Sequence, residues 1–157
     1  MKNLLTKPWL KPIPKWIVAV LFFAALVGFL DSFYLTLQRY MGFEISCTIL
    51  EGCNQVSQSA YSAIFGIPLS LVGCIYYFLM LLCGIALFDG KRPAFLLVIV
   101  LLSGLGVASA AWLLYAQAFL IKAFCIYCLL SAVASLVLLA TSFISYKVYA
   151  GFLNDRH

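Results

Sequence analysis

Four long apolar runs constrain this chain more than any other feature of its sequence. Each run supplies the roughly 20 mostly apolar residues that a helix needs to cross a lipid bilayer. We place the runs at residues 16–37, 68–88, 94–120 and 124–149. Of the 157 residues, 66% are hydrophobic and only 10% are charged, which is not the composition of a soluble domain. The sequence therefore predicts an all-α integral membrane protein, a bundle of four transmembrane helices.

The remaining segments flank or connect these four spans. Residues 1–15 are a basic arm, residues 38–67 form the one long polar loop, and residues 150–157 are a polar tail. A cleaved signal peptide is the alternative interpretation of the first run. The run continues past Asp31, however, and no small-residue cleavage motif follows it. We therefore expect residues 16–37 to remain as a membrane span.

Lysine and arginine residues are distributed unevenly between the two sides of the predicted bundle. If the N-terminus is cytoplasmic, eight of the ten lie on the cytoplasmic side, and Arg39 and Lys122 lie on the other. Cytoplasmic loops of membrane proteins carry an excess of these residues. The sequence thus predicts cytoplasmic termini and an extracytoplasmic loop at 38–67. The net charge of +5 reflects this topology rather than nucleic-acid binding.

Four of the six cysteines form two close pairs. Cys125 and Cys128 lie three residues apart at the start of the fourth run, a spacing that puts two helical residues on one face. Cys47 and Cys53 lie in the long loop. The predicted topology places both pairs on the side where disulfides persist. Thiol–disulfide exchange requires a thiolate and a reachable disulfide, so we predict a relay between the two pairs.

The positions of the cysteines predict the order of the relay. Cys125 lies near the start of a helix, where the helix dipole lowers a thiol pKa and favours exchange with Cys53. Cys128 lies one turn deeper, about 4.5 Å along the helix axis, and would meet a quinone inside the bundle. The predicted flow of electrons runs from a reduced partner protein through Cys47–Cys53 and Cys125–Cys128 to the quinone.

A short amphipathic helix is predicted within the long loop. Apolar residues recur at helical spacing after Cys53, Asn54 is a favourable N-cap, and Gly66 and Pro68 end the pattern. We expect this helix to lie at the membrane interface and to cover the mouth of the bundle. Cys53 would then lie just before its first turn.

Several residues inside the spans have weaker signals. Tyr76, Tyr77, Tyr115 and Gln117 are candidate hydrogen-bond donors to the quinone. Asp31 is an acid within a span, and we expect it to bond a neighbouring helix rather than to react. The two remaining cysteines, Cys74 and Cys83, have no close partner in the sequence and are expected to be inert core residues.

Two other classes of protein remain as alternatives. A non-enzymatic membrane scaffold or transporter subunit would use the cysteines as structural disulfides. A metal-binding membrane protein would use the four paired thiolates as ligands, since zinc prefers four. The wide spacing of Cys47 and Cys53 is unusual for such a site.

Taken in order, these features resemble the vitamin K epoxide reductase family in its bacterial form. The resemblance covers residues from about 28 to 135 and implies a four-helix bundle around a quinone. It further implies that Cys125–Cys128 is the active-site disulfide, that Cys47–Cys53 is the shuttle, and that Ser59 lies near the quinone. The matching residues are Cys47, Cys53, Ser59, Phe65-Gly66-Ile67-Pro68, Gly73, Tyr76-Tyr77 and Phe124-Cys125-Ile126-Tyr127-Cys128.

The resemblance also implies a setting for the reaction. It points to a bacterial inner membrane, to ubiquinone or menaquinone as the acceptor, and to a separate thioredoxin-like (DsbA-like) thiol oxidase as the partner, because no thioredoxin-like domain follows in this sequence. The order of the cysteine pairs differs from that in the membrane protein DsbB, where the CxxC comes first. The vitamin K-binding asparagine and tyrosine of the vertebrate enzymes fall on Leu69 and Ala132, which favours plain quinone reduction over epoxide reduction.

Overall fold

The structure, a computed structural model, describes residues 13–42, 53–64, 66–88 and 94–154. Within this part of the chain, four helical stretches are long and apolar enough to cross a membrane. The predicted all-α membrane bundle is therefore confirmed. The stretches are α1 (Lys15–Met41), α3 (Leu69–Phe88), α4 (Ala94–Tyr115) with the π-helical segment η3 (Ala116–Ile121) that continues it, and α5 (Ile126–Asn154).

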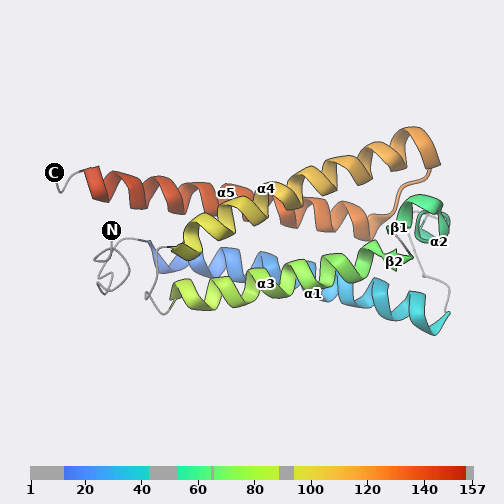
Figure 1. Cartoon of the computed structure of the whole chain (residues 1–157), viewed down its shortest axis with the longest axis horizontal. Helices are drawn as coiled ribbons and strands as arrows, with labels where there is room; N and C mark the ends of the chain where they lie inside the picture. The colour runs from blue at the N-terminus through green and yellow to red at the C-terminus, as the bar shows by residue number, and fades with distance from the viewer. Residues whose placement is uncertain (1–12, 43–52, 65, 89–93, 155–157) are drawn as a thin grey trace.

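The four long helices run alternately in opposite directions along one elongated bundle (Figure 1). Helix α1 packs against both α3 and α5, and α4 packs mainly against α5 and less extensively against α3. The start of α1 and the end of α5 lie at one end of the bundle. The short helix α2 (Cys53–Gln58) and the strands β1 (Ala63–Ile64) and β2 (Ile67–Pro68) lie at the opposite end.

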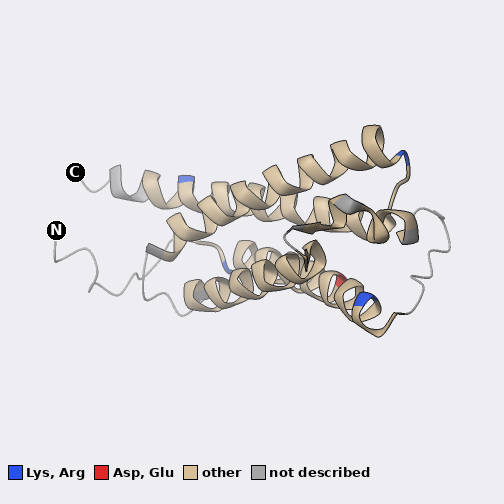
Figure 2. Cartoon of the chain, turned by 45° about the vertical axis from the view of Figure 1, so that its right-hand side comes forward, with Lys and Arg blue, Asp and Glu red and all other residues tan. Residues whose placement is uncertain are grey.

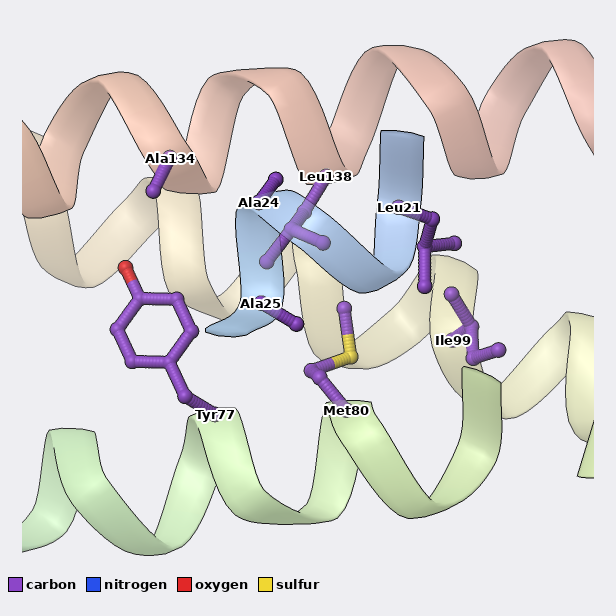
Figure 3. Close-up of a cluster of buried hydrophobic side chains, with 8 residues drawn as sticks. All are labelled: Leu21, Ala24, Ala25, Tyr77, Met80, Ile99, Ala134 and Leu138. Carbon is purple, nitrogen blue, oxygen red and sulfur yellow. The ribbon is translucent and has the colours of Figure 1, made fainter. Parts of the chain in front are cut away.

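The centre of the bundle is a cluster of buried side chains contributed by all four long helices (Figure 3). Because lipid is as apolar as these side chains, close packing rather than the hydrophobic effect holds such helices together. Gly28 shows how close the packing is, since a Cβ added there would lie 2.3 Å from the Tyr77 ring. The cluster consists of Leu21, Ala24, Ala25, Tyr77, Met80, Ile99, Ala134 and Leu138.

Hydroxyl groups tie the helices to one another within this packing. The Tyr77 hydroxyl donates to the Ser131 carbonyl oxygen at 2.8 Å and lies 3.0 Å from Ser135 Oγ, which joins α3 to α5. Ser103 Oγ and Ser142 Oγ lie 2.9 Å apart and join α4 to α5. Such interhelical bonds contribute on average about 0.6 kcal/mol each in a membrane protein.

The segment between α1 and α3 differs from its prediction. A short helix is present, but it ends at Gln58 instead of continuing to Gly66, and the 3-10 helix η2 (Ala60–Ser62) follows it. The backbone of Ser59 is extended, and the Ser62 hydroxyl lies within hydrogen-bonding distance of the Ser57 and Ser59 carbonyl oxygens. Serine side chains that bond nearby carbonyls compete with helical hydrogen bonds, which explains the early end.

A two-stranded hairpin completes this segment. Strands β1 and β2 pair antiparallel, with Ile64 opposite Ile67. Gly66 lies in the turn between them with φ +81°, in the left-handed region that glycine adopts without a steric penalty. The predicted continuation of the helix through these residues is therefore wrong, because this glycine belongs to a hairpin turn.

Charged positions are sparse along the bundle (Figure 2). In the described part of the chain, Lys15 and Lys147 lie toward the end where α1 begins and α5 finishes. Arg39 and Lys122 lie toward the end that carries α2. Asp31, on α1, is the one acidic residue among the described residues.

Candidate active site

A cavity of about 430 Å³ opens inside the α2 end of the bundle. All four long helices contribute to its largely apolar wall, and α2 and η2 line its end. Both Leu69 and Ala132, the two apolar replacements noted in the sequence, lie in this wall. Its polar and sulfur-bearing lining residues are Asp31, Ser32, Arg39, Cys53, Ser57, Ser59, Tyr61, Ser62, Ser70, Tyr76, Tyr77, Ser109, Gln117, Cys125, Cys128, Ser131 and Ser135.

Cys125 lies at the first position before α5. The helix begins at Ile126, two residues later than predicted, and its first hydrogen bond runs from the Leu129 N–H to the Cys125 carbonyl oxygen at 3.1 Å. Cys125 is therefore the N-cap, the position whose side chain meets the free N–H groups of the first turn. Cys128 lies one turn into the helix, so the two sulfurs face each other.

The surroundings of Cys125 favour its thiolate. Cys125 and Cys128 are both free thiols in this structure. The Cys128 thiol donates a hydrogen bond to the Cys125 sulfur, and the backbone N–H groups of Tyr127 and Cys128 donate two more. Although burial opposes them, these bonds lower the pKa of Cys125 from 9.0 to about 6. The lowered pKa predicted for this cysteine thus has the hydrogen bond from Cys128 as its main cause.

Gln117 holds the turn that presents Cys125. Its side-chain Oε1 accepts a hydrogen bond from the Cys125 backbone N–H at 3.0 Å. Its backbone carbonyl accepts from the N–H groups of Lys122 and Ala123, and Lys122 has the left-handed φ of 56° that this tight turn requires. One residue of η3 therefore fixes both the turn and the first residue of the CxxC.

Cys53 and Cys125 belong to one buried cluster, together with Val56 of α2. The two cysteine side chains are 1% and 2% exposed. Cys53 is the first residue of α2 and is disulfide-bonded. Cys47, the loop cysteine predicted to pair with it, lies outside the described residues. The α2 end of the bundle thus brings a loop cysteine against the CxxC, although they are far apart in the sequence.

The other two cysteines lie elsewhere. Cys74 and Cys83 are free, half-buried thiols on α3, and neither lines the cavity. No other cysteine is found within the described residues. Neither belongs to the buried cluster that contains Cys125, and their inert role stays a prediction.

Arg39 anchors α2 to the end of α1. Its Nη1 donates to the Ser57 carbonyl oxygen and to Ser62 Oγ, the latter at 2.7 Å. In the sequence, Arg39 indicated only the orientation of the chain in the membrane, so its contact with α2 was not predicted. The contact depends on the three-dimensional placement of α2, which no local pattern reveals.

Of the five residues predicted to contact a quinone, Ser59, Tyr76, Tyr77 and Gln117 line the cavity, but they differ in what they can donate. Tyr115 is half exposed and does not line it. The Tyr76 hydroxyl is buried and makes no hydrogen bond with any described residue. Gln117 Nε2 is buried without a hydrogen bond to a nitrogen or oxygen atom of the described residues, and the Gln117 side chain lies beside the Cys128 thiol. The Tyr77 hydroxyl donates to α5, and the Ser59 hydroxyl donates to the Val56 carbonyl oxygen at 2.8 Å. Among these residues, the Tyr76 hydroxyl therefore presents a free donor to a ligand, and Gln117 Nε2 presents a donor beside the Cys128 sulfur.

The cavity and its cysteines fall within a stretch that matches a known family. A sequence profile described as "Vitamin K epoxide reductase family" matches residues 19–143, most of the chain. The chain belongs to the vitamin K epoxide reductase family. The match runs from α1 into α5, so it includes every helix that lines the cavity and both cysteines of the CxxC.

A curated relative of this vitamin K epoxide reductase family member carries a functional name. The protein is the "Thiol-disulfide oxidoreductase LTO1" of Arabidopsis thaliana, which is 30% identical over 114 residues. The aligned part covers 68% of this chain and 30% of that protein. The chain therefore spans less than a third of the length of this relative.

Proposed function

We propose that this protein is a quinone-dependent thiol oxidoreductase that supports disulfide bond formation. The observation that carries the proposal is the buried cluster of Cys53 and Cys125, because it brings a loop cysteine against the CxxC at the wall of a cavity. Membership of the vitamin K epoxide reductase family supports the same chemistry, as does the name of the Arabidopsis relative.

The proposed exchange steps follow the order of the four cysteines along the electron path. A reduced partner dithiol opens the Cys47–Cys53 disulfide, and the partner leaves oxidised. The Cys53 thiolate then attacks the Cys125 sulfur of the Cys125–Cys128 disulfide and releases Cys128. Cys47 next attacks Cys53, which restores the loop disulfide and leaves Cys125 and Cys128 reduced. A disulfide at Cys53 together with free thiols at Cys125 and Cys128 corresponds to this last state.

The cavity fits a quinone as the final acceptor of the electron pair. Its apolar walls suit a quinone ring, and its size is that of a small-molecule site. Among the described residues, the Tyr76 hydroxyl is a buried donor without a partner, and Gln117 Nε2 is a buried donor beside the Cys128 thiol. A bound quinone carbonyl could accept hydrogen bonds from both. Cys128 and Gln117 line the same cavity. The reduced CxxC and the hydrogen-bond donor of Gln117 would therefore reach the same ligand.

The proposed setting is the inner membrane of a bacterium. Both chain ends would be cytoplasmic and the cysteines extracytoplasmic, in line with the lysine and arginine distribution. The start of α1 and the end of α5 share one end of the bundle, which supports this topology. The partner would be a separate thioredoxin-like (DsbA-like) thiol oxidase, and the acceptor would be ubiquinone or menaquinone.

Quinone reduction by the protein in liposomes tests the proposal. A reduced thioredoxin-like dithiol protein is added outside the liposomes with a short-chain quinone, and quinol is followed by absorbance. We expect one quinol for each partner disulfide formed. Cys128→Ser should stop quinol formation, whereas Cys74→Ser should not. The proposal would be contradicted by partner oxidation without quinol formation, or by unchanged turnover in Cys128→Ser. Cysteines whose redox state does not change when quinone is added would also contradict it.

A further inference from the structure

The reaction proposed above leaves one proton without a source, and the inference that follows rests on that reaction. Reduction of a quinone to a quinol takes two electrons and two protons. Formation of the Cys125–Cys128 disulfide supplies both electrons. Because the hydrogen bond from Cys128 lowers the pKa of Cys125 to about 6, its sulfur is mainly a thiolate near neutral pH, and the Cys128 thiol is the main source of a proton within the pair. The second proton must come from another group at the cavity.

Asp31 is the acidic residue that lines the cavity. It lies on α1, is 7% exposed, and is the one carboxyl side chain among the described residues. It interacts electrostatically with both Cys125 and Cys128. Ionisable residues within membrane spans are rare, and they mark functional pathways such as proton relays.

A packing role for Asp31 does not fit its contacts. Neither Oδ1 nor Oδ2 makes a hydrogen bond with any described residue, so the bond to a neighbouring helix expected from the sequence is absent there. The nearby Tyr77 hydroxyl, which would be the natural donor, gives its proton to the Ser131 carbonyl oxygen. An unpartnered carboxyl group is far less unfavourable to bury in its neutral form than as a carboxylate.

We propose that Asp31 is the acid that gives the second proton to the quinone. The Cys125 thiolate and the Cys128 thiol form a disulfide, and their electron pair and the Cys128 proton go to the quinone. The Asp31 carboxylic acid supplies the remaining proton, which completes the quinol and leaves a carboxylate. The carboxylate regains its proton from water at the α2 end, where Arg39, Ser57 and Ser59 form a polar wall of the same cavity.

The test compares Asp31→Asn and Asp31→Glu with the wild-type protein in liposomes. Asparagine keeps the size and polarity of the side chain but cannot release a proton. We expect Asp31→Asn to lower kcat for quinol formation by about 100-fold or more, with little change in the KM for quinone. Asp31→Glu should recover a substantial part of this loss, because it restores a carboxylic acid.

A second readout separates this proposal from the relay itself. The rate at which the partner dithiol reduces Cys125–Cys128 is measured without quinone, by trapping free thiols. This rate should be the same in Asp31→Asn and wild type. Ser103→Ala is the matched control, because it removes a buried polar group that lies away from the cavity. It should leave both rates unchanged.

Three outcomes would overturn the role of Asp31 and leave the relay standing. The first is wild-type quinol formation in Asp31→Asn. The second is a rise in KM for quinone at constant kcat, which would make Asp31 a binding residue. The third is an equal loss in Asp31→Asn and Asp31→Glu that also slows the partner step, which would make Asp31 structural. Absence of quinol formation in the wild type would instead overturn the proposed function.

Discussion

Cys53 of α2 and Cys125 at the start of α5 pack in the same buried cluster, and both are almost fully excluded from solvent. Two contacts hold them there. Arg39 ties α2 to α1, and Gln117 ties the Cys125 backbone to η3. Since exchange between cysteines requires direct approach of two sulfurs, this arrangement is the physical basis of the proposed electron path.

The thiolate character of Cys125 predicts a pH dependence. In protein whose loop pair is oxidised and whose CxxC is reduced, thiolate absorbance should rise with a midpoint near pH 6, because the pKa of Cys125 is lowered to about 6. In Cys128→Ala the midpoint should move up toward the ordinary 9.0, since the hydrogen bond from Cys128 is the main cause of the shift. An unchanged midpoint in that variant would contradict this assignment.

Close packing around the Tyr76 hydroxyl predicts that one added methyl group, at Gly106, will disturb quinone binding. A Cβ at Gly106 would lie 2.3 Å from the Tyr76 hydroxyl oxygen, whereas a Cβ at Gly104, on the same helix, would meet nothing within 4 Å. Gly106→Ala should therefore displace Tyr76 and raise the KM for quinone, as Tyr76→Phe should. Gly104→Ala is the control and should behave as wild type. Equal kinetics for all three variants would exclude Tyr76 from quinone binding.

The contacts of Arg39 predict that it controls exchange but not quinone reduction. Arg39→Met keeps the apolar stem but loses the hydrogen bonds to Ser57 and Ser62. Hydrogen bonds from a charged group contribute about 1.5–3 kcal/mol, so transfer from the loop pair to Cys125 should slow by roughly tenfold or more. The first turnover of quinol formation after chemical reduction of the CxxC should stay normal, because it does not depend on proton uptake at the polar wall that includes Arg39. Lys147→Met, at the opposite end of the bundle, should change neither rate.

For the two remaining cysteines, we predict that substitution leaves quinone turnover unchanged. Cys74 and Cys83 lie outside the cavity wall. Serine at either position should keep quinone turnover within about twofold of wild type, because neither sulfur lies on the electron path. Steady-state kinetics of the two single variants in liposomes checks this. An inactive Cys74→Ser protein that still folds would mean that the path includes a cysteine on α3.

Much of the fold and part of the site can be predicted from the sequence. Long apolar runs report membrane helices directly, since the bilayer sets their length and composition. The CxxC at the start of the last run predicts both the chemistry and its place at the bundle end. These features are local, so a single sequence reveals them.

The rest depends on contacts between distant segments. The predicted helix after Cys53 was longer than the observed one. The Ser62 hydroxyl that bonds carbonyl oxygens beyond its end does so only in the folded turn. Gln117 was predicted as a quinone donor, but its bonds to the turn before Cys125 appear only in three dimensions. The Asp31 carboxyl group makes no hydrogen bond with any described residue. A sequence pattern cannot reveal this, because it depends on how the helices pack.

The most direct test of the account is the capture of a disulfide between Cys53 and Cys125. A variant with Cys47, Cys74, Cys83 and Cys128 replaced by serine keeps only these two cysteines. Mild oxidation in the membrane, followed by peptide mass spectrometry, should give the Cys53–Cys125 disulfide as the main product within one molecule. If both thiols instead stay free or cross-link only between molecules, the loop cannot deliver electrons to the CxxC and the account is contradicted.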